Sequence, residues 1–208
     1  MKKADWIPEV VIQRLPIYLR ALAQFEYQKT EVVSSQELGE RLHLTAVQIR
    51  KDLSYFGRFG KQGHGYNVKR LLQELRKILG LGREWPMALV GVGHLGRAIM
   101  GYAGFSPDGF QVVAAFDTDP AQIGKKVGSL VVQNMSQLPQ AVKKFGIHIA
   151  IVAVPPSEAQ AAVDALVKSG VASILNYAPI SARVPPGVKV RDIDPVLALQ
   201  SMTYYLKA

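Results

Sequence analysis

The sequence Met87-Ala-Leu-Val-Gly-Val-Gly-His-Leu-Gly96 decides the fold of most of this 208-residue chain. Its apolar start, residues 87–90, passes directly into a Gly-x-Gly-x-x-Gly turn and then into a stretch with helical character. A second apolar run, residues 110–116, ends at Asp117, which follows the last glycine of the turn by 21 residues. Strand, glycine turn, helix, strand and acid in this order predict a Rossmann-like parallel sheet that binds a dinucleotide.

Each glycine of this turn has its own physical reason. Gly91 and Gly93 let the backbone turn sharply and approach a pyrophosphate, and Gly96 admits the following helix against the strand. The start of that helix attracts phosphate groups. The positions between the glycines are predicted to contact the cofactor as well: Val92, His94 and Leu95.

The acid at the end of the second strand predicts which dinucleotide binds. Asp117 is placed to accept hydrogen bonds from the adenosine ribose, and its charge repels the 2'-phosphate of NADP. The expected cofactor is therefore NADH or NAD+, although Lys125 and Lys126 nearby weaken the preference. Two alternatives stay open at this point, a coenzyme A site and glycines that serve close packing alone.

Two later strands extend the predicted sheet. Residues 147–154 form a near-continuous apolar run, as in a buried parallel strand, and residues 173–176 repeat the pattern. Ligands of open α/β sheets bind outside the carboxyl ends of the strands. The residues at the carboxyl ends of these two strands are therefore predicted to line the nicotinamide end: Pro155, Asn176, Tyr177 and Ala178.

The N-terminal third carries two helix starts in quick succession. Ser34 and Glu37 have the spacing of a capping box, and Thr45 and Gln48 repeat it eleven residues later. Two short capped helices this close together predict a helix-turn-helix. Upstream, helical apolar spacing is interrupted by Pro16, which predicts a break in that helix near Leu15.

The second of these helices presents a surface that suits a DNA groove. With Ile49 facing the core, helical rotation turns Val47, Lys51, Ser54 and Tyr55 outward and places Gln48 and Arg50 on the flanks. Gln can pair with adenine, Arg or Lys with guanine, and Val47 suits a thymine methyl group. An ordinary solvated helix face remains the alternative.

A glycine-rich, basic segment follows, residues 57–68, and predicts a β-hairpin wing. Its Arg58, Lys61 and His64 are expected to reach the sugar-phosphate chain or the minor groove. The charge agrees with this reading, because the net charge of +9 is concentrated here. Between Thr45 and Arg70 a single acid, Asp52, stands against six basic residues: Arg50, Lys51, Arg58, Lys61, Lys69 and Arg70.

Several classes of function are excluded or disfavoured. The chain has no cysteine and its four histidines are scattered, so we expect no metal. No long apolar span or signal-peptide core is visible, so the protein is expected to be cytoplasmic with no membrane contact. A dehydrogenase needs a proton-transfer residue, yet the histidines of the nucleotide fold are poorly placed, which predicts no enzyme and no catalytic residue. A small NAD-dependent oxidoreductase stays open as an alternative.

The predicted fold class is α/β, with three parts. Residues 1–82 form a winged helix-turn-helix domain, residues 83–193 a Rossmann NAD(H)-binding domain, and residues 194–208 a C-terminal helix. This helix is more apolar than a free terminal helix should be. It is expected either to pack on its own sheet or to cover a partner subunit as a swapped dimerisation helix.

Four stretches in this order carry a family resemblance: TAVQIRKDLSYFG (residues 45–57), GKQGHGYNV (60–68), Gly91–Gly96 followed by Asp117, and LNYAP (175–179). Together they resemble the Rex family of redox-sensing repressors, over nearly the whole length. The resemblance implies a homodimer that binds palindromic operator DNA of respiration and fermentation genes when NADH is low and releases it when NADH binds. It also implies a switch formed by Arg20, Tyr102 and Asp194.

Overall fold

The computed structural model describes residues 7–60 and 63–206. The chain divides into two compact units, with the boundary between Arg83 and Glu84. Each unit has its own hydrophobic core. No helix within the described ranges is long and apolar enough to cross a membrane.

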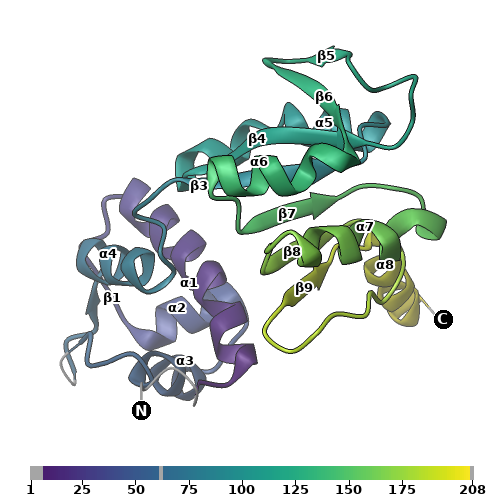
Figure 1. Cartoon of the computed structure of the whole chain (residues 1–208). Coiled ribbons are helices and arrows are strands. Elements are labelled where there is room, and N and C mark those ends of the chain that lie inside the picture. Colours follow the sequence, from purple (N-terminus) through teal and green to yellow (C-terminus); the bar gives the residue numbers. More distant parts are fainter. Residues whose placement is uncertain (1–6, 61–62, 207–208) are drawn as a thin grey trace. The chain divides into compact units, whose positions relative to one another are not determined.

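The described part of the N-terminal unit forms four helices and a two-stranded sheet (Figure 1). In chain order its elements are α1 (Glu9–Tyr27), β1 (Val32–Val33), α2 (Ser35–Leu42), α3 (Ala46–Ser54), β2 (Tyr66–Asn67) and α4 (Val68–Ile78). Every helix contributes fully buried side chains to one cluster, among them Leu22, Leu38, Ile49 and Leu75. The predicted pair of short helices is thus confirmed as α2 and α3.

Local chemistry explains where α2 begins and ends. Ser34 Oγ accepts from Glu37 N at 3.0 Å, and the Glu37 carboxylate accepts from Ser34 N at 2.7 Å, which confirms the first capping box. The backbone hydrogen bond from Ser34, with the Ser34 side chain, lowers the pKa of Glu37. His43 ends the helix in the left-handed region, at φ +55°, and so allows the tight turn before α3.

The break predicted near Leu15 does not occur, because α1 runs without interruption from Glu9 to Tyr27 with Pro16 inside it. Proline costs a helix one hydrogen bond and a steric clash, together about 3 kcal/mol. The buried residues of α1 lie on both sides of Pro16, with Val11 before it and Tyr18 and Leu22 after it. A break would expose part of this stripe, so packing outweighs the local preference.

The wing also differs from the prediction. Within the described part of residues 57–68 only Tyr66 and Asn67 form a strand, and their partners are Asn67↔Val32 and Tyr66↔Val33 on β1. The strand pairing is therefore made with residues that precede α2, rather than within a hairpin. An added Cβ at Gly65 would lie 2.7 Å from Val33 O, so the close approach of these strands requires glycine there.

The C-terminal unit is built on a seven-stranded sheet. The strands are β3 (Trp85–Val90), β4 (Phe110–Asp117), β5 (Lys126–Val127), β6 (Leu130–Asn134), β7 (Ile149–Val152), β8 (Ser173–Asn176) and β9 (Lys189–Asp192). Their order is β5-β6-β4-β3-β7-β8-β9, and all neighbours are parallel except β5 and β6. Without β5 this is the doubly wound Rossmann order, so the predicted fold class is confirmed.

Both faces of the sheet are covered. Ala88 and Val90 of β3 pack with α6 (Leu138–Phe145) and α7 (Pro156–Lys168) on one face. Met87 and Leu89 point the other way and pack with α5 (His94–Met100) and the short helix η2 (Ala103–Asp108). Because β3 lies between β4 and β7, the chain order reverses beside it, and ligands of such sheets bind at this point.

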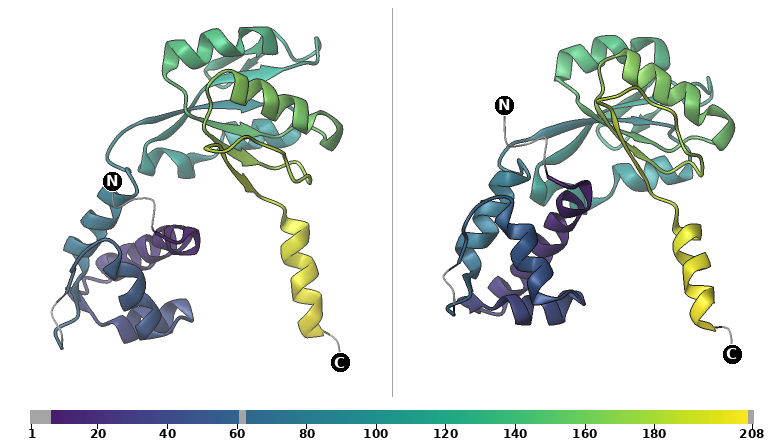
Figure 2. Two further views of the ribbon diagram at one scale, coloured as in Figure 1. Left: turned by 60° about the horizontal axis from the view of Figure 1, so that its bottom comes forward. Right: turned by 90° about the horizontal axis from the view of Figure 1, so that it is seen from below.

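The last helix differs from the others. α8 (Pro195–Thr203) has no buried residue among those described, although its sequence is mainly apolar. Figure 2 shows it beyond the end of β9, standing clear of the sheet. Its exposed apolar residues continue into η4 (Tyr204–Leu206): Val196, Leu197, Leu199, Met202, Tyr204, Tyr205 and Leu206.

Candidate dinucleotide site and DNA-reading surface

The glycine turn after β3 has the geometry that a pyrophosphate requires. Gly91 has φ +93°, and a Cβ there would lie 2.5 Å from Ala153 O at the end of β7. A Cβ at Gly96 would lie 2.0 Å from Gly91 O, so helix α5 can approach the strand only with glycine at this position. A Cβ at Gly93 would meet nothing within 4 Å and would point into open space. The turn is therefore closely packed against the sheet at Gly91 and Gly96 and open to solvent at Gly93.

Asp117 at the end of β4 holds this turn in place. Its Oδ2 accepts from the backbone N of Val92 at 2.7 Å, and its Oδ1 accepts from Asp119 N at 2.9 Å. A carboxylate oxygen can accept more than one hydrogen bond, so each oxygen retains capacity toward a ribose hydroxyl. Asp117 thus supports the turn, and its carboxylate can still accept a further hydrogen bond.

Beside Asp117 lies a hollow of about 390 Å³. Its walls are mainly apolar and come from β3, α7, the short helix η3 (Met135–Gln137) and the segment after β7: Val90, Met135, Val154, Ala161, Ala162 and Ala165. Thr118, Ser157 and Glu158 also line it, and Thr118 Oγ1 donates to Glu158 Oε2 at 3.3 Å. A flat apolar ring with polar edges, such as adenine, suits this composition.

The α7 wall of this hollow and Arg97 were missed in the sequence. Arg97 follows Gly96 directly, and its Nε donates to Val92 O at 3.2 Å while Nη2 donates to Gln122 Oε1 at 2.6 Å. Val92 in the glycine turn is thus held at its carbonyl by Arg97 and at its N–H by Asp117. A cation next to the last glycine of the turn was the signal that could have pointed to it.

The other predicted cofactor residues are placed unequally. His94, Leu95 and Pro155 are exposed around the turn, whereas the Val92 side chain is fully buried, so only its backbone can meet a ligand. Asn176 differs from the prediction most. Its side chain is fully buried, and the two hydrogens of Nδ2 are shared among Ala178 O, Ile180 O and Asp192 Oδ1, while Oδ1 accepts from Ala178 N. This side chain positions the loop that carries the half-buried Tyr177, and the buried Ala178 offers mainly backbone.

The predicted DNA-reading residues lie on α3 and along a groove beside it. Val47 is 64% exposed, and Thr45, Arg50, Lys51 and Ser54 are exposed as well, while Tyr55 is half-buried. The groove has a volume of about 700 Å³ and runs between α3 and the glycine segment, where Arg50, Ser54, Arg58 and Tyr66 line it. Arg50 Nη1 donates to Ser35 Oγ at 2.8 Å, which holds its guanidinium at the groove.

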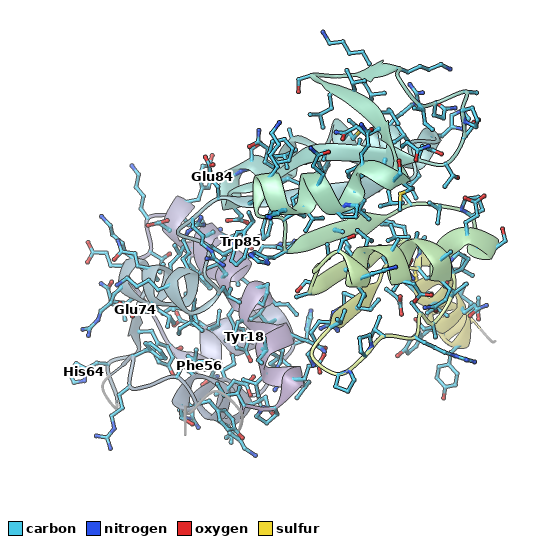
Figure 3. The ribbon with its side chains drawn as sticks, in the orientation of Figure 1. Tyr18, Phe56, His64, Glu74, Glu84 and Trp85 are labelled. Carbon is cyan, nitrogen blue, oxygen red and sulfur yellow. The ribbon has the colours of Figure 1, made fainter. Side chains whose placement is uncertain are left out.

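Two further predicted contacts lie on the glycine segment. His64 is exposed and lies at the rim of the N-terminal unit, far from the buried Tyr18 (Figure 3). Lys61 lies outside the described residues. Tyr66 also lines the groove. Its burial raises its pKa.

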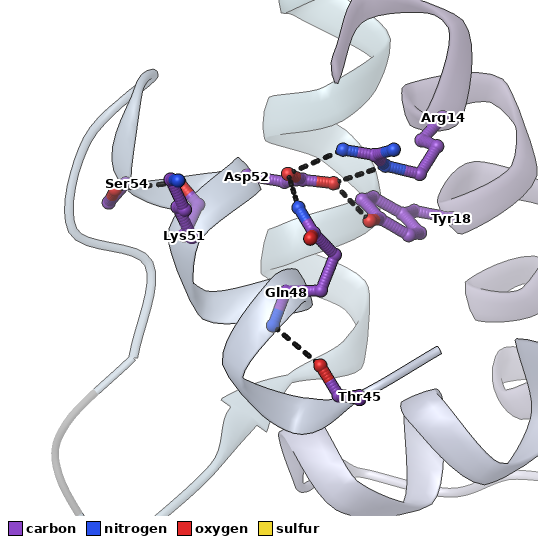
Figure 4. A network of polar contacts seen from close by, with 7 residues as sticks. All are labelled: Arg14, Tyr18, Thr45, Gln48, Lys51, Asp52 and Ser54. Atoms are coloured by element: carbon purple, nitrogen blue, oxygen red, sulfur yellow. Dashed lines mark hydrogen bonds and ion pairs between the residues drawn. The ribbon is translucent and has the colours of Figure 1, made fainter. Parts of the chain in front are cut away.

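A buried carboxylate joins the reading helix to α1. Asp52 accepts from Arg14 Nε at 2.6 Å and Nη2 at 2.8 Å, from the Tyr18 hydroxyl at 2.5 Å and from Gln48 Nε2 at 2.7 Å (Figure 4). Burial alone would raise the pKa of Asp52, but these hydrogen bonds outweigh it and hold the pKa below its usual value. Burial and the bond to Asp52 raise the pKa of Tyr18 far above its usual value.

This network changes the second predicted capping box. Thr45 Oγ1 accepts from Gln48 N at 3.1 Å, as expected, but the Gln48 side chain does not return to the backbone of Thr45. Its amide bonds Asp52 instead, because an ionised acceptor one helical turn away is the stronger partner. The prediction was therefore right for half of the box.

Comparison with known proteins decides the family. A family model described as "Putative DNA-binding protein N-terminus" matches residues 6–54, and one described as "CoA binding domain" matches residues 82–180. The "Redox-sensing transcriptional repressor Rex" of Chloroflexus aurantiacus is 53% identical over 206 residues, which cover 99% of this chain and 97% of the relative. This chain belongs to the Rex family of redox-sensing transcriptional repressors.

Solved Rex-family structures agree with this assignment. The crystal structure of RSP in complex with β-NAD+ and operator DNA is 36% identical, with a TM-score of 0.90 and coverage of 96% of this chain and 92% of that one. The RSP complex with β-NADH is 34% identical, with a TM-score of 0.87 and coverage of 97% and 94%. The predicted family and the regulator function without enzyme activity are thereby confirmed, and the RSP structures hold the cofactor class that the sequence predicts for this chain.

The three switch residues predicted from the Rex resemblance occupy different elements. Arg20 is exposed on α1, and Tyr102 is 62% exposed after α5, with its ring edge-to-face with Phe105 at 5.1 Å. Asp194 caps α8, since its Oδ1 accepts from Val196 N at 2.9 Å. All three side chains are available for contacts beyond their own element.

Proposed function

We propose that this chain is a transcriptional repressor that senses the NADH/NAD+ ratio. It binds operator DNA when NADH is low and releases the DNA when NADH binds. The observation that carries the proposal is the combination, in one Rex-family chain, of an exposed basic α3 and a glycine turn held by Asp117 beside an apolar hollow. The RSP complexes with β-NAD+ and operator DNA and with β-NADH support both halves.

The cofactor roles follow the geometry. The pyrophosphate lies over Gly93, the adenine enters the hollow beside Val90, and Asp117 accepts from the ribose. The nicotinamide lies toward Pro155 and Tyr177 at the ends of β7 and β8. When bound, the dinucleotide supplies a redox-dependent ring at that end, and the protein residues supply binding and orientation.

On the DNA side, the residues divide by chemistry. Val47, Gln48 and Arg50 read base edges in the major groove, while the remaining predicted residues hold the sugar-phosphate chain. These are Thr45, Lys51, Ser54, Tyr55, Arg58, Lys61 and His64. Their positive charge makes the affinity depend steeply on salt.

The repressor acts as a homodimer on palindromic DNA in the cytoplasm. Its DNA-binding domain comprises residues 1–82, its cofactor domain residues 83–193 and its dimerisation helix residues 194–208. The exposed apolar face of α8 supports the dimer, because seven apolar side chains of α8 and η4 are between 52% and 83% exposed in the single chain. Covering them with a second copy removes this surface from water. A two-fold dimer also matches a palindromic operator.

The switch consists of Arg20, Tyr102 and Asp194, with a contact between the Arg20 guanidinium and the Asp194 carboxylate of the other subunit. An Arg-carboxylate contact of this kind can be made or broken by a small movement, so each cofactor form can favour one state. Asp194→Ser keeps a capping oxygen for α8 but loses the charge. DNA binding by this variant should become insensitive to NADH, and an unchanged NADH response would remove Asp194 from the switch.

The decisive experiment is a fluorescence-anisotropy titration at fixed salt. The full chain first selects a palindromic duplex from a random pool, and the complex is then titrated with NADH, NAD+, NADPH and coenzyme A. Release by NADH but not by NAD+ supports the proposal. Release by coenzyme A alone would assign the site to coenzyme A. This ligand is the second candidate because residues 82–180 match the "CoA binding domain" model.

A further inference from the structure

The Gln48 amide has a fixed orientation on the reading helix. Gln48 is the third residue of α3, at the end of a recognition helix that contacts base edges in helix-turn-helix proteins. Its Nε2 donates to Asp52 Oδ1 at 2.7 Å. An ionised carboxylate only accepts, so the nitrogen of the amide must face Asp52 and Oε1 must lie on its other side.

Asp52 cannot turn to release this amide. Its carboxylate is fully buried, and Arg14 and Tyr18 of α1 take both of its oxygens. Figure 4 shows the Asp52 carboxylate between Arg14, Tyr18 and the nitrogen of the Gln48 amide, with the Gln48 oxygen turned away from it. Within the described part of the chain no donor is bonded to Gln48 Oε1, so this oxygen is available as an acceptor.

The free atoms of the amide match some bases and not others. Adenine presents a donor, N6, and an acceptor, N7, in the major groove, and these pair with Oε1 and the second hydrogen of Nε2. Cytosine presents a donor, N4. Guanine and thymine present only acceptors in the major groove, so either base would leave Oε1 facing another acceptor without a donor.

We propose that Asp52 is a specificity-positioning residue, which fixes Gln48 so that it reads a base amine, adenine before cytosine, and rejects guanine and thymine. The inference rests on the proposed function, because it requires α3 to enter the major groove. It also assigns to the buried ion pair a role besides holding α1 and α3 together.

The test measures base preference at each position. The full chain binds a duplex pool with a randomised half-site at fixed salt, and sequencing of bound and free duplexes gives relative affinities. In the wild-type protein one position of each half-site should favour adenine by about 5- to 150-fold, the discrimination of one bidentate contact. Gln48→Met should flatten that position alone, while Gln73→Met, an exposed glutamine on α4, should leave the profile unchanged.

Two measurements address Asp52 itself. The double variant Arg14→Met/Asp52→Leu removes the buried pair without leaving an unpaired charge, so the fold should persist. Guanine and thymine should then become acceptable at the Gln48 position, with the other positions unchanged. In NMR spectra of the wild-type protein, the Gln48 side-chain amide, assigned by its absence in Gln48→Met, should show one hydrogen protected from exchange.

Each outcome has a distinct meaning. An unchanged profile in Gln48→Met, or a uniform loss of affinity in the double variant, overturns the inference while the proposed function stands. Averaged, fast-exchanging amide hydrogens of Gln48 also overturn it, even where the double variant does not fold. A wild-type protein without any base preference overturns the proposed function first, and this inference with it.

Discussion

The carboxylate of Asp117 and the backbone N–H of Val92 lie 2.7 Å apart, although 25 residues separate them in the sequence. This hydrogen bond joins the end of β4 to the glycine turn after β3. The residue expected to bind the ribose is therefore also a structural support of the pyrophosphate turn. We therefore expect the affinity for the cofactor to depend on this side chain in two ways, through the ribose contact and through the shape of the turn.

Asp117→Ala is accordingly expected to weaken NADH binding at least tenfold, because it removes the ribose acceptor and loosens the turn. DNA binding should remain, since the change lies in the other unit. Isothermal titration with NADH measures the effect. Asp119→Ala is the matched control, because among the described residues that carboxylate bonds only the nearby Ala121 N, at 2.8 Å. This variant should keep an NADH affinity close to that of the wild type. Equal affinities of the two variants would contradict this role of Asp117.

Gly93→Ala should separate binding from folding. Its added methyl group points into open space, so the melting temperature should stay within about one degree of the wild type. The same methyl group occupies the expected place of the pyrophosphate, so the NADH affinity should fall more than tenfold. Gly91→Ala, with its positive φ and its clash with Ala153 O, should lower the melting temperature instead. Normal NADH binding by Gly93→Ala would refute the placement of the phosphates.

Acid should destabilise the N-terminal unit through Asp52. The folded-state pKa of Asp52 lies below that of an unfolded aspartate, about 3.9. Its contribution to stability is therefore complete above that value and is lost as the pH falls through the folded pKa. Asp52→Asn should lower the free energy of unfolding by about 3 kcal/mol at neutral pH. Below pH 4 the stability of this variant should depend less on pH than that of the wild type. Urea unfolding between pH 6 and pH 3 tests this, and parallel curves for both proteins would exclude Asp52 as a source of the dependence.

Lys51→Ala should weaken DNA binding equally for all duplex sequences. Lys51 is exposed on α3, and a phosphate contact there releases about one counterion. The slope of log affinity against log salt should fall by about one. Anisotropy titrations between 50 and 200 mM salt on the selected duplex and on a scrambled duplex measure both effects. A selective loss on the former would instead make Lys51 a base contact.

Charge on α8 should break the dimer. In the double variant Leu197→Glu/Leu199→Glu, two apolar side chains that are 62% and 60% exposed in the single chain become acidic. Burying them against a second copy would then cost several kcal/mol, so light scattering should report a monomer. Gln200→Glu adds charge to the same helix without removing apolar surface and should stay dimeric. A dimeric double variant would place the interface elsewhere.

The sequence could predict what depends on near neighbours. The glycine turn, the strand ending at Asp117 and the capping box at Ser34 depend on residues a few positions apart, and all three were predicted. Pro16 was misjudged because the buried stripe of α1 continues across it. The Gln48 cap failed because Asp52 captures its amide, and Asp52 is itself fixed by Arg14, 38 residues away. The wing strand pairs with β1, more than thirty residues upstream, which no local pattern reveals.

The pairing of β1 with β2 also constrains how the reading surface can respond to a signal. These strands flank the stretch from Ser34 to Gly65, which contains α2 and α3, so their pairing holds the two ends of this stretch together. Asp52 joins the middle of that stretch to α1. Separating α3 from the unit would require breaking both the β1–β2 pairing and the buried ion pair between Arg14 and Asp52. We therefore expect α2 and α3 to move together when the repressor releases DNA, so that their orientation changes while their fold is kept.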